Sequence, residues 1–189
     1  MILFEAPPTI NPTCITRGCE KIASFDCPDC DSPGMFCQSC LLDIHRHHIL
    51  HRPRKWNGEF FETTSFHKEG LVVNLGHGEA HCPHMMNAGG PYDVTVVDVN
   101  GVHLIRMGWC RCASGGSYAE QLLSRRMVPT TILRPRTAFT FRLLKLFHMM
   151  HHTGRINPWD FSGAMHRLTD NVNPQAIPVN SFHQSPAFF

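Results

Sequence analysis

The stretch that decides the fold runs from Cys27 to His51 and reads CPDCDSPGMFCQSCLLDIHRHHILH. It holds two Cys-x-x-Cys pairs separated by six residues, and four histidines follow within seven positions. Zinc prefers thiolate and neutral imidazole ligands, and a structural zinc site takes four of them in a tetrahedron. Turn-forming Gly, Pro and Asp residues are frequent around these ligands, and apolar residues are too few for an independent core. We therefore expect metal ions to replace a hydrophobic core in this part of the chain.

The nine cysteines of this 189-residue chain are better explained by metal binding than by disulfides. An odd number excludes complete internal pairing, and Cys-x-x-Cys pairs followed by histidines have zinc-ligand spacing. Unpaired thiols are typical of a reducing compartment, the cytosol or the nucleus. The net charge of +2 argues against a polycationic tail. No apolar run reaches ~18 residues, so no membrane contact is expected.

Eight potential ligands between residues 13 and 56 fall into four sequential pairs, enough for two tetrahedral zinc ions. In cross-brace modules, pairs one and three share one ion, and pairs two and four share the other. The expected sites are Cys14, Cys19, Cys37 and Cys40 for one ion, and Cys27, Cys30, His45 and His51 for the second. His47 and His48 are spare histidines next to the second site. The pattern resembles the B-box zinc module, although the first pair is wider than the common two-residue spacing.

A second cluster offers ligands for a third zinc ion. It contains the remaining three cysteines, Cys82, Cys110 and Cys112, and we expect His77 to be the fourth ligand. Other histidines lie nearby in the sequence: His81, His84 and His103. The alternative interpretation is a half-buried thiol pair that holds no metal.

The clearest strand signal is YDVTVVDVNGVHLIRMGWCRC, residues 92–112. Its two β-rich runs flank Asn100 and Gly101, a dipeptide preferred in type I′ turns, so we predict a hairpin at about 93–110. The following YAEQLLSRRM, residues 118–127, is typical of a short helix that stops before Pro129.

A C-terminal pair of helices is also predicted. Apolar residues recur at helical spacing on one face: Phe139, Leu143, Leu146, Phe147 and Met150. Gly154 is the expected stop of the first helix. Asn157 is the expected N-cap of the second, with Pro158 at its first position.

The predicted fold class is α+β. It combines a small zinc-stabilised cross-brace module, a β-hairpin-containing region and a C-terminal helical pair. The expected domains are a B-box-like double zinc module at 13–56, a mixed α/β region with the second Cys/His cluster at 57–130, a helical segment at 131–171 and a disordered tail at 172–189.

Several segments, taken in sequence order, resemble segments of a known protein family. They are the cysteine/histidine pairs, KWNGEFF (55–61), LGHGEAHCP (75–83), VVDVNGVHLIRMGWCRC (96–112), YAEQLL (118–123), VPTTILRPRTAFTF (128–141) and FSGAMHRLTDN (161–171). Together, over about residues 14–171, they resemble the Cys-x-Cys cysteine-cluster domain found beside KDZ transposases in fungi, chiefly mushroom-forming ones. The resemblance implies an accessory region of a DNA transposase, located in the nucleus or alternatively the cytoplasm. A larger catalytic region with an RNase H-like fold follows in such proteins, so we expect this chain to be a truncated or relic product without it.

The expected function is therefore a non-catalytic zinc-binding accessory domain that contacts transposon DNA or transposase subunits, with no small-molecule substrate. The alternative is a B-box-like protein–protein interaction module. Basic residues that gather along the chain are the expected nucleic-acid contacts: Arg52, Arg54, Lys55, Arg134 and Arg136. Ordinary solvation of a protein surface is the other interpretation of these residues. The acidic residues are scattered and do not form the converging carboxylates of a two-metal nuclease site.

Overall fold

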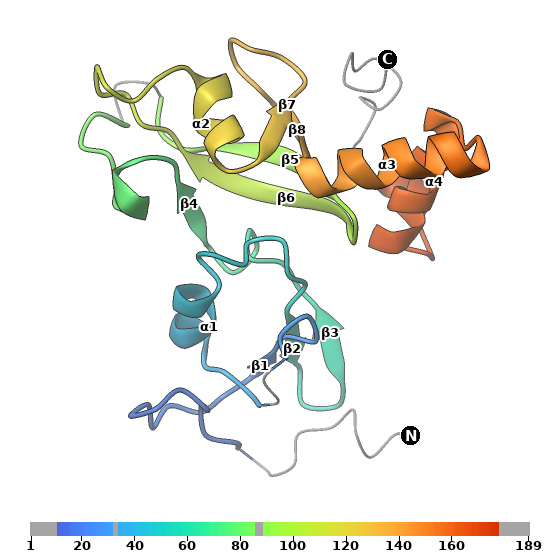
Figure 1. Cartoon of the computed structure of the whole chain (residues 1–189). Coiled ribbons are helices and arrows are strands. Elements are labelled where there is room, and N and C mark those ends of the chain that lie inside the picture. Colours follow the sequence, from blue (N-terminus) through green and yellow to red (C-terminus); the bar gives the residue numbers. More distant parts are fainter. Residues whose placement is uncertain (1–10, 32–33, 86–88, 178–189) are drawn as a thin grey trace. The chain divides into compact units, whose positions relative to one another are not determined.

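The computed structural model describes residues 11–31, 34–85 and 89–177 (Figure 1). The chain divides into Met1–Leu71 and Val72–Phe189, here called the N-terminal unit and the C-terminal unit. Helices and sheets both occur, so the predicted α+β class is confirmed. The boundary expected after residue 56 falls inside the N-terminal unit, and the one expected after residue 130 falls inside the C-terminal unit. Over the described ranges, no helix is both long and apolar enough to cross a membrane.

The N-terminal unit is built from very short elements. Strands β1 (Phe25–Asp26), β2 (Arg54–Trp56) and β3 (Phe61–Thr63) form an antiparallel sheet in the order β1-β2-β3, and helix α1 spans Gln38–Ile44. One of its clusters of buried residues consists of Cys14, Ala23, Met35 and Cys37. Half of that cluster is cysteine, so thiol side chains make up much of the packing at this place.

The C-terminal unit contains a five-stranded mixed sheet in the order β4-β6-β5-β8-β7. The strands are β4 (Val72–Asn74), β5 (Tyr92–Asp98), β6 (Gly101–Gly108), β7 (Met127–Pro129) and β8 (Thr137–Thr140). The predicted hairpin is confirmed: β5 and β6 pair antiparallel from Tyr92 opposite Met107 to Asp98 opposite Gly101. The turn itself differs from the expected type I′ turn at Asn100 and Gly101: Gly101 already pairs with Asp98, so the turn residues are Val99 and Asn100, and only Gly101 has a positive φ, 117°.

The helices of the C-terminal unit begin at recognisable caps. In α2 (Tyr118–Ser124), Ser117 and Glu120 form a capping box. In α4 (Pro158–Thr169), the Asn157 side chain accepts the N–H of Asp160 and Pro158 takes the first turn, as predicted. Short 3₁₀ turns span His77–Glu79 (η2) and Pro174–Ala176 (η4).

Two expectations about the C-terminal part need correction, and a third, the tail at 172–189, falls largely on residues that the structure does not describe. Residues 131–140 are not helical: Phe139, expected on a helix face, lies in β8, and α3 spans Phe141–Gly154 because Thr140 is its N-cap. The left-handed residue that ends α3 is Arg155, with φ 52°, while Gly154 is the last helical residue. Of the tail expected to be disordered, residues 178–189 lie outside the described residues, and 172–177 include η4.

An apolar core joins the sheet to α3 and α4. It consists of buried residues from five elements, β5, β6, β8, α3 and α4: Val97, Val102, Phe139, Leu143, Phe147, Phe161 and Met165. The Phe147 and Phe161 rings pack with centroids 5.0 Å apart. The seven buried residues of this core include no cysteine, so apolar side chains without thiols pack the sheet against α3 and α4.

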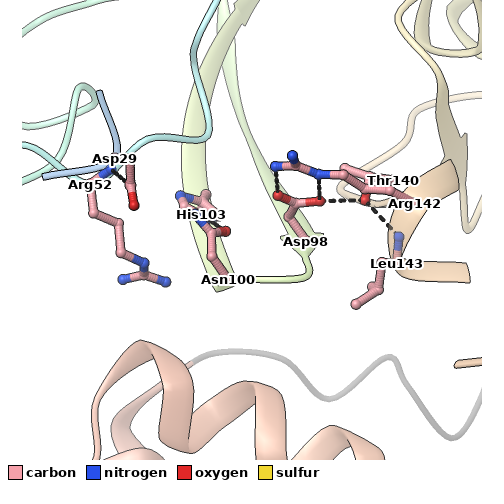
Figure 2. Close-up of polar contacts among 8 residues, drawn as sticks. All are labelled: Asp29, Arg52, Asp98, Asn100, His103, Thr140, Arg142 and Leu143. Carbon is pink, nitrogen blue, oxygen red and sulfur yellow. Dashed lines mark hydrogen bonds and ion pairs between the residues drawn. The ribbon is translucent and has the colours of Figure 1, made fainter. Parts of the chain in front are cut away.

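A buried carboxylate fixes the junction between β5 and α3. Asp98 is fully buried and accepts hydrogen bonds from Thr140 Oγ1 at 2.6 Å and from Nε and Nη2 of Arg142 (Figure 2). Thr140 Oγ1 also accepts the N–H of Leu143, which caps α3. Burial raises the pKa of Asp98, but the bonds from Arg142 and Thr140 outweigh burial and hold the pKa below its usual value. The ionised form therefore stabilises the fold above the usual carboxyl pKa, and this contribution is lost as pH falls through the lowered value.

We expect Asp98→Asn to reduce the free energy of unfolding by about 2 kcal/mol, because the charged acceptor of a buried, hydrogen-bonded pair is lost. Urea denaturation followed by tryptophan fluorescence measures this change. Lys145→Gln, an exposed change on the same α3 helix, is the control and should shift stability by less than about 0.5 kcal/mol. Equal stability of Asp98→Asn and the wild type would contradict the role given to Asp98.

Candidate metal centres

The first Cys group lies in the N-terminal unit and draws on one loop and the start of a helix. Cys14 donates its N–H to the Lys21 carbonyl, and Cys19 donates to that of Thr16, which folds this loop back on itself. Cys37 is the N-cap of α1 and Cys40 lies in its first turn. The four sulfurs of Cys14, Cys19, Cys37 and Cys40 all lie within 4.8 Å of one another.

The sulfur spacing in this group suits a metal rather than a disulfide. Cys19 Sγ and Cys37 Sγ are 3.8 Å apart. A disulfide needs about 2.05 Å, whereas a tetrahedron with Zn–S bonds of about 2.3 Å has edges of about 3.8 Å. The geometry and the donor set of four thiols therefore fit a tetrahedral zinc ion.

The second group combines two cysteines and two histidines of the N-terminal unit. Cys30 Sγ lies 3.2 Å from His45 Nε2 and 3.5 Å from His51 Nδ1, and Cys27 Sγ lies 3.6 Å from the same Nδ1. A tetrahedral zinc ion with S and N ligands has S–N edges of about 3.5 Å. These four ligand atoms also lie within 4.8 Å of one another.

The C-terminal end of α1 orients the His45 side chain. Its side chain is fully buried, and Nδ1 lies 2.8 Å from the Leu41 carbonyl, which can only accept. Nδ1 therefore carries the proton, and Nε2 presents its lone pair toward Cys30. Burial lowers the pKa of His45, so the imidazole is neutral near pH 7. A neutral imidazole is the form that binds a metal ion.

The third group lies in the C-terminal unit, between the η2 loop and the end of β6. His77 Nε2 lies 3.2 Å from Cys110 Sγ and 3.3 Å from Cys112 Sγ, and Cys82 Sγ lies 3.8 Å from Cys112 Sγ. All four ligand atoms lie within 4.8 Å of one another. Cys82 and Cys110 are buried, Cys112 is half-buried and His77 is exposed, so this group is closer to the surface than the other two.

Two features outside the ligand pattern hold the third group in place. The Gln121 side chain accepts the N–H of Cys110 and donates to the carbonyl of the same residue, both at 2.9 Å. Gly76, with φ 94°, lets the η2 loop approach Cys110, because a Cβ there would lie 2.9 Å from Cys110 Cβ. The spacing of ligands gives no signal for Gln121; a polar residue beside Leu122 in an amphipathic helix is the only sequence hint.

The pKa values of the thiols differ between the groups. The N–H of Arg111 donates to Cys82 and is the largest of several hydrogen bonds that lower the pKa of this thiol to about 6. Burial, together with the neighbouring Cys30 sulfur, raises the pKa of Cys27 to about 12. Several thiolates at this spacing repel one another, and a divalent cation is the group that holds them all deprotonated.

The spare histidines take other positions. The His48 ring packs 4.9 Å from that of His51, next to the second group. His103 Nε2 lies 2.7 Å from Asn100 Oδ1 across the hairpin turn, so this side chain serves the hairpin (Figure 2). His81 and His84 are exposed in the loop that carries Cys82.

The residues expected to bind nucleic acid lie in both units of the chain. In the N-terminal unit, Arg54 forms a 2.5 Å ion pair with Asp26. The Arg52 backbone N–H donates to Asp29 (Figure 2), and Lys55 is exposed over the Phe25 ring.

In the C-terminal unit, Arg134 and Arg136 are exposed and both lie over the ring of Tyr92. A third arginine, Arg111, lies over Tyr118 and was missed by sequence reasoning. Its position in the sequence, between the expected ligands Cys110 and Cys112, could have identified it as a candidate.

Comparison with known proteins finds one family. The model of a CxC2-like cysteine cluster associated with KDZ transposases matches residues 66–173, more than half of the chain. The match includes β4 through α4 and all four residues of the third group, while the ligands of the first two groups precede it. No curated protein and no solved structure matches the chain. The chain belongs to the family of CxC2-like cysteine clusters associated with KDZ transposases.

Proposed function

We propose that this chain is a non-catalytic, zinc-organised accessory module of a KDZ-type transposase, and that it contacts DNA in the nucleus. The observation that carries the proposal is the convergence of three groups of four Cys and His ligand atoms, each within 4.8 Å. Zinc is the proposed ion, because four thiolate and imidazole ligands in a tetrahedron are its preferred structural environment. The ligands are the twelve residues of the three groups.

A structural role is favoured by the completeness of each ligand set. A catalytic zinc ion keeps one position open for water, whereas each of these groups offers four protein ligands. Glu79, the acidic residue nearest to the third group in sequence, forms a 2.6 Å ion pair with Arg125. Asp98 is bound by Arg142 and Thr140. These carboxylates serve the fold, which supports a module without chemistry of its own.

DNA contact is supported by the family link and by exposed basic residues. KDZ transposases act on DNA, and the family of this chain is associated with them. Arginine and lysine side chains on a metal-stabilised scaffold bind phosphates through charge, without reading sequence.

A second candidate function concerns the N-terminal unit. Its eight ligands precede the residues matched by the family, and the pairing of first with third and second with fourth ligand pairs resembles a B-box. This unit would then contact a transposase subunit or a second copy of the chain. Light scattering distinguishes this protein-binding role from DNA contact. Self-association that does not weaken as the salt concentration rises favours the protein-binding role.

The third centre is tested by two histidine variants in one loop. We expect native mass spectrometry with elemental analysis to give three zinc ions for the wild type, two for His77→Gln and three for His81→Gln. His77 is a ligand in the proposed site, whereas His81 is exposed beside it. Three zinc ions bound to His77→Gln, or only two bound to the wild type, would contradict the proposal of a third zinc centre.

Chelation should affect the two units differently. After zinc is removed, we expect amide hydrogen exchange in residues 13–65 to approach the rate of an unfolded chain, because metal replaces the core there. Amides of β5, β6 and α3 should stay protected by the apolar core around Phe139 and Leu143. Unchanged protection in 13–65 would contradict the role of metal as the organiser of the N-terminal unit.

DNA contact should depend steeply on salt. We expect the wild-type chain to bind a short duplex at low salt, with log K falling linearly against log salt by about 0.9 for each contacted phosphate. Fluorescence anisotropy with a labelled duplex measures this slope. Absence of binding at low salt would sink the DNA role and leave subunit contact as the proposed function.

A further inference from the structure

An aromatic stack in the C-terminal unit provides a rigid platform. Tyr92 begins β5, Trp109 follows β6 and Tyr118 begins α2. The Tyr92 and Trp109 rings are stacked with centroids 5.2 Å apart, and the Trp109 and Tyr118 rings meet edge to face at 4.7 Å. Tyr92 and Trp109 are buried. Three segments distant in sequence therefore meet at one packed aromatic cluster.

Three exposed arginines lie on this platform. The guanidinium carbons of Arg134 and Arg136 are 5.2 Å and 4.8 Å from the Tyr92 centroid, and that of Arg111 is 4.4 Å from the Tyr118 centroid. An aromatic face attracts and orients a guanidinium group but does not neutralise its charge. The oriented fork can still donate several N–H groups to one anion.

These arginines differ from others in the same unit. Arg125 and Arg142 form ion pairs with Glu79 and Asp98. For Arg111, Arg134 and Arg136, no ion pair with a carboxylate is found in the part of the chain that the structure describes. Their charges are thus available to an external anion, whereas the paired arginines hold the fold together.

The Tyr92 hydroxyl supplies a second, independent observation. It is buried and has no hydrogen-bond partner among the described residues. Burial raises the pKa of Tyr92 to about 12, while the positive charges of Arg134, Arg136 and Arg111 each oppose this rise. The hydroxyl stays protonated near pH 7 and can donate. A buried donor without a partner is costly, and an anion held by the arginines would supply the acceptor.

The loop that carries two of these arginines also exposes apolar side chains. Ile132 and Leu133, in the β7–β8 connection just before Arg134, are 70% and 87% exposed. Exposed aliphatic side chains contribute nothing to the binding of a free anion. Proteins that bend DNA combine phosphate-binding arginines with apolar side chains that press between base steps.

We propose that Arg111, Arg134 and Arg136, on the Tyr92–Trp109–Tyr118 stack, form a phosphate-binding surface for the backbone of duplex DNA, with Ile132 and Leu133 entering the groove. This inference rests on the proposed DNA contact and locates it in the C-terminal unit. Arg111 lies between two ligands of the third metal centre, and its N–H donates to Cys82 Sγ. The metal centre thereby positions one arginine of the surface.

The test compares two double variants that remove the same charge. Arg134→Gln with Arg136→Gln removes two residues of the surface, and Arg155→Gln with Arg167→Gln removes two exposed arginines on the α3–α4 side. Anisotropy with a labelled duplex should show at least about a tenfold loss of affinity for the first pair, and a salt slope smaller by about 2. The control pair should lose less than about threefold. All four positions are exposed, and circular dichroism with zinc content verifies folding.

A second variant tests the apolar part of the surface. Ile132→Ser with Leu133→Ser should lower affinity several-fold and leave the salt slope unchanged, because no phosphate contact is removed.

Equal losses in the surface and control arginine pairs, with wild-type binding intact, would overturn the surface and leave the DNA role standing. No wild-type binding to duplex would overturn both. Binding to phosphatidylserine vesicles that depends on Arg134 and Arg136, with DNA binding unaffected by them, would assign the surface to a membrane and overturn the proposal.

Discussion

Thiol sulfurs about 3.8 Å apart are too distant for a disulfide and too close to be ionised together without a cation. This constraint governs all nine cysteines, which lie in three groups with three histidines. Each group draws its residues from segments that are distant in sequence, such as the Cys14 loop and the start of α1. In the N-terminal unit the same residues also contribute to packing, since Cys14 and Cys37 belong both to a candidate metal group and to a buried cluster of four residues.

The C-terminal unit uses the same constraint for a different purpose. Its stability comes from the apolar core around Phe139, and from Asp98, which ties β5 to the start of α3. The third group instead fixes the η2 loop against the end of β6, where Gln121 holds the Cys110 backbone from both sides. In this unit, metal would order a local surface on a scaffold that is already folded, which is the arrangement expected of a binding site.

What could be predicted from the sequence was local. Asn100 and Gly101 mark the position of the hairpin, although its turn is centred on Val99 and Asn100. Asn157 with Pro158 specifies the start of α4, because cap preferences act over a few residues. The ligand groups were expected from spacing, and the structure brings the same residues together. Phe139 was misplaced because a helical period continues across Thr140, whereas residues 137–139 pair with β5 through contacts distant in sequence. The stack of Tyr92, Trp109 and Tyr118 was invisible for the same reason.

A net charge of +2 would ordinarily argue against nucleic-acid binding, but net charge measures the long-range field and not the contact. Arginines paired with Asp26, Glu79 and Asp98 contribute to the fold and little to an external anion. Arginines on aromatic rings keep their charge and lose part of their conformational freedom before binding, so less entropy is lost when a phosphate is held. Three such side chains on one surface give a short-range contact whose strength depends on their geometry. Sequence-level charge counting cannot separate these two kinds of arginine, because the difference lies in what each guanidinium touches.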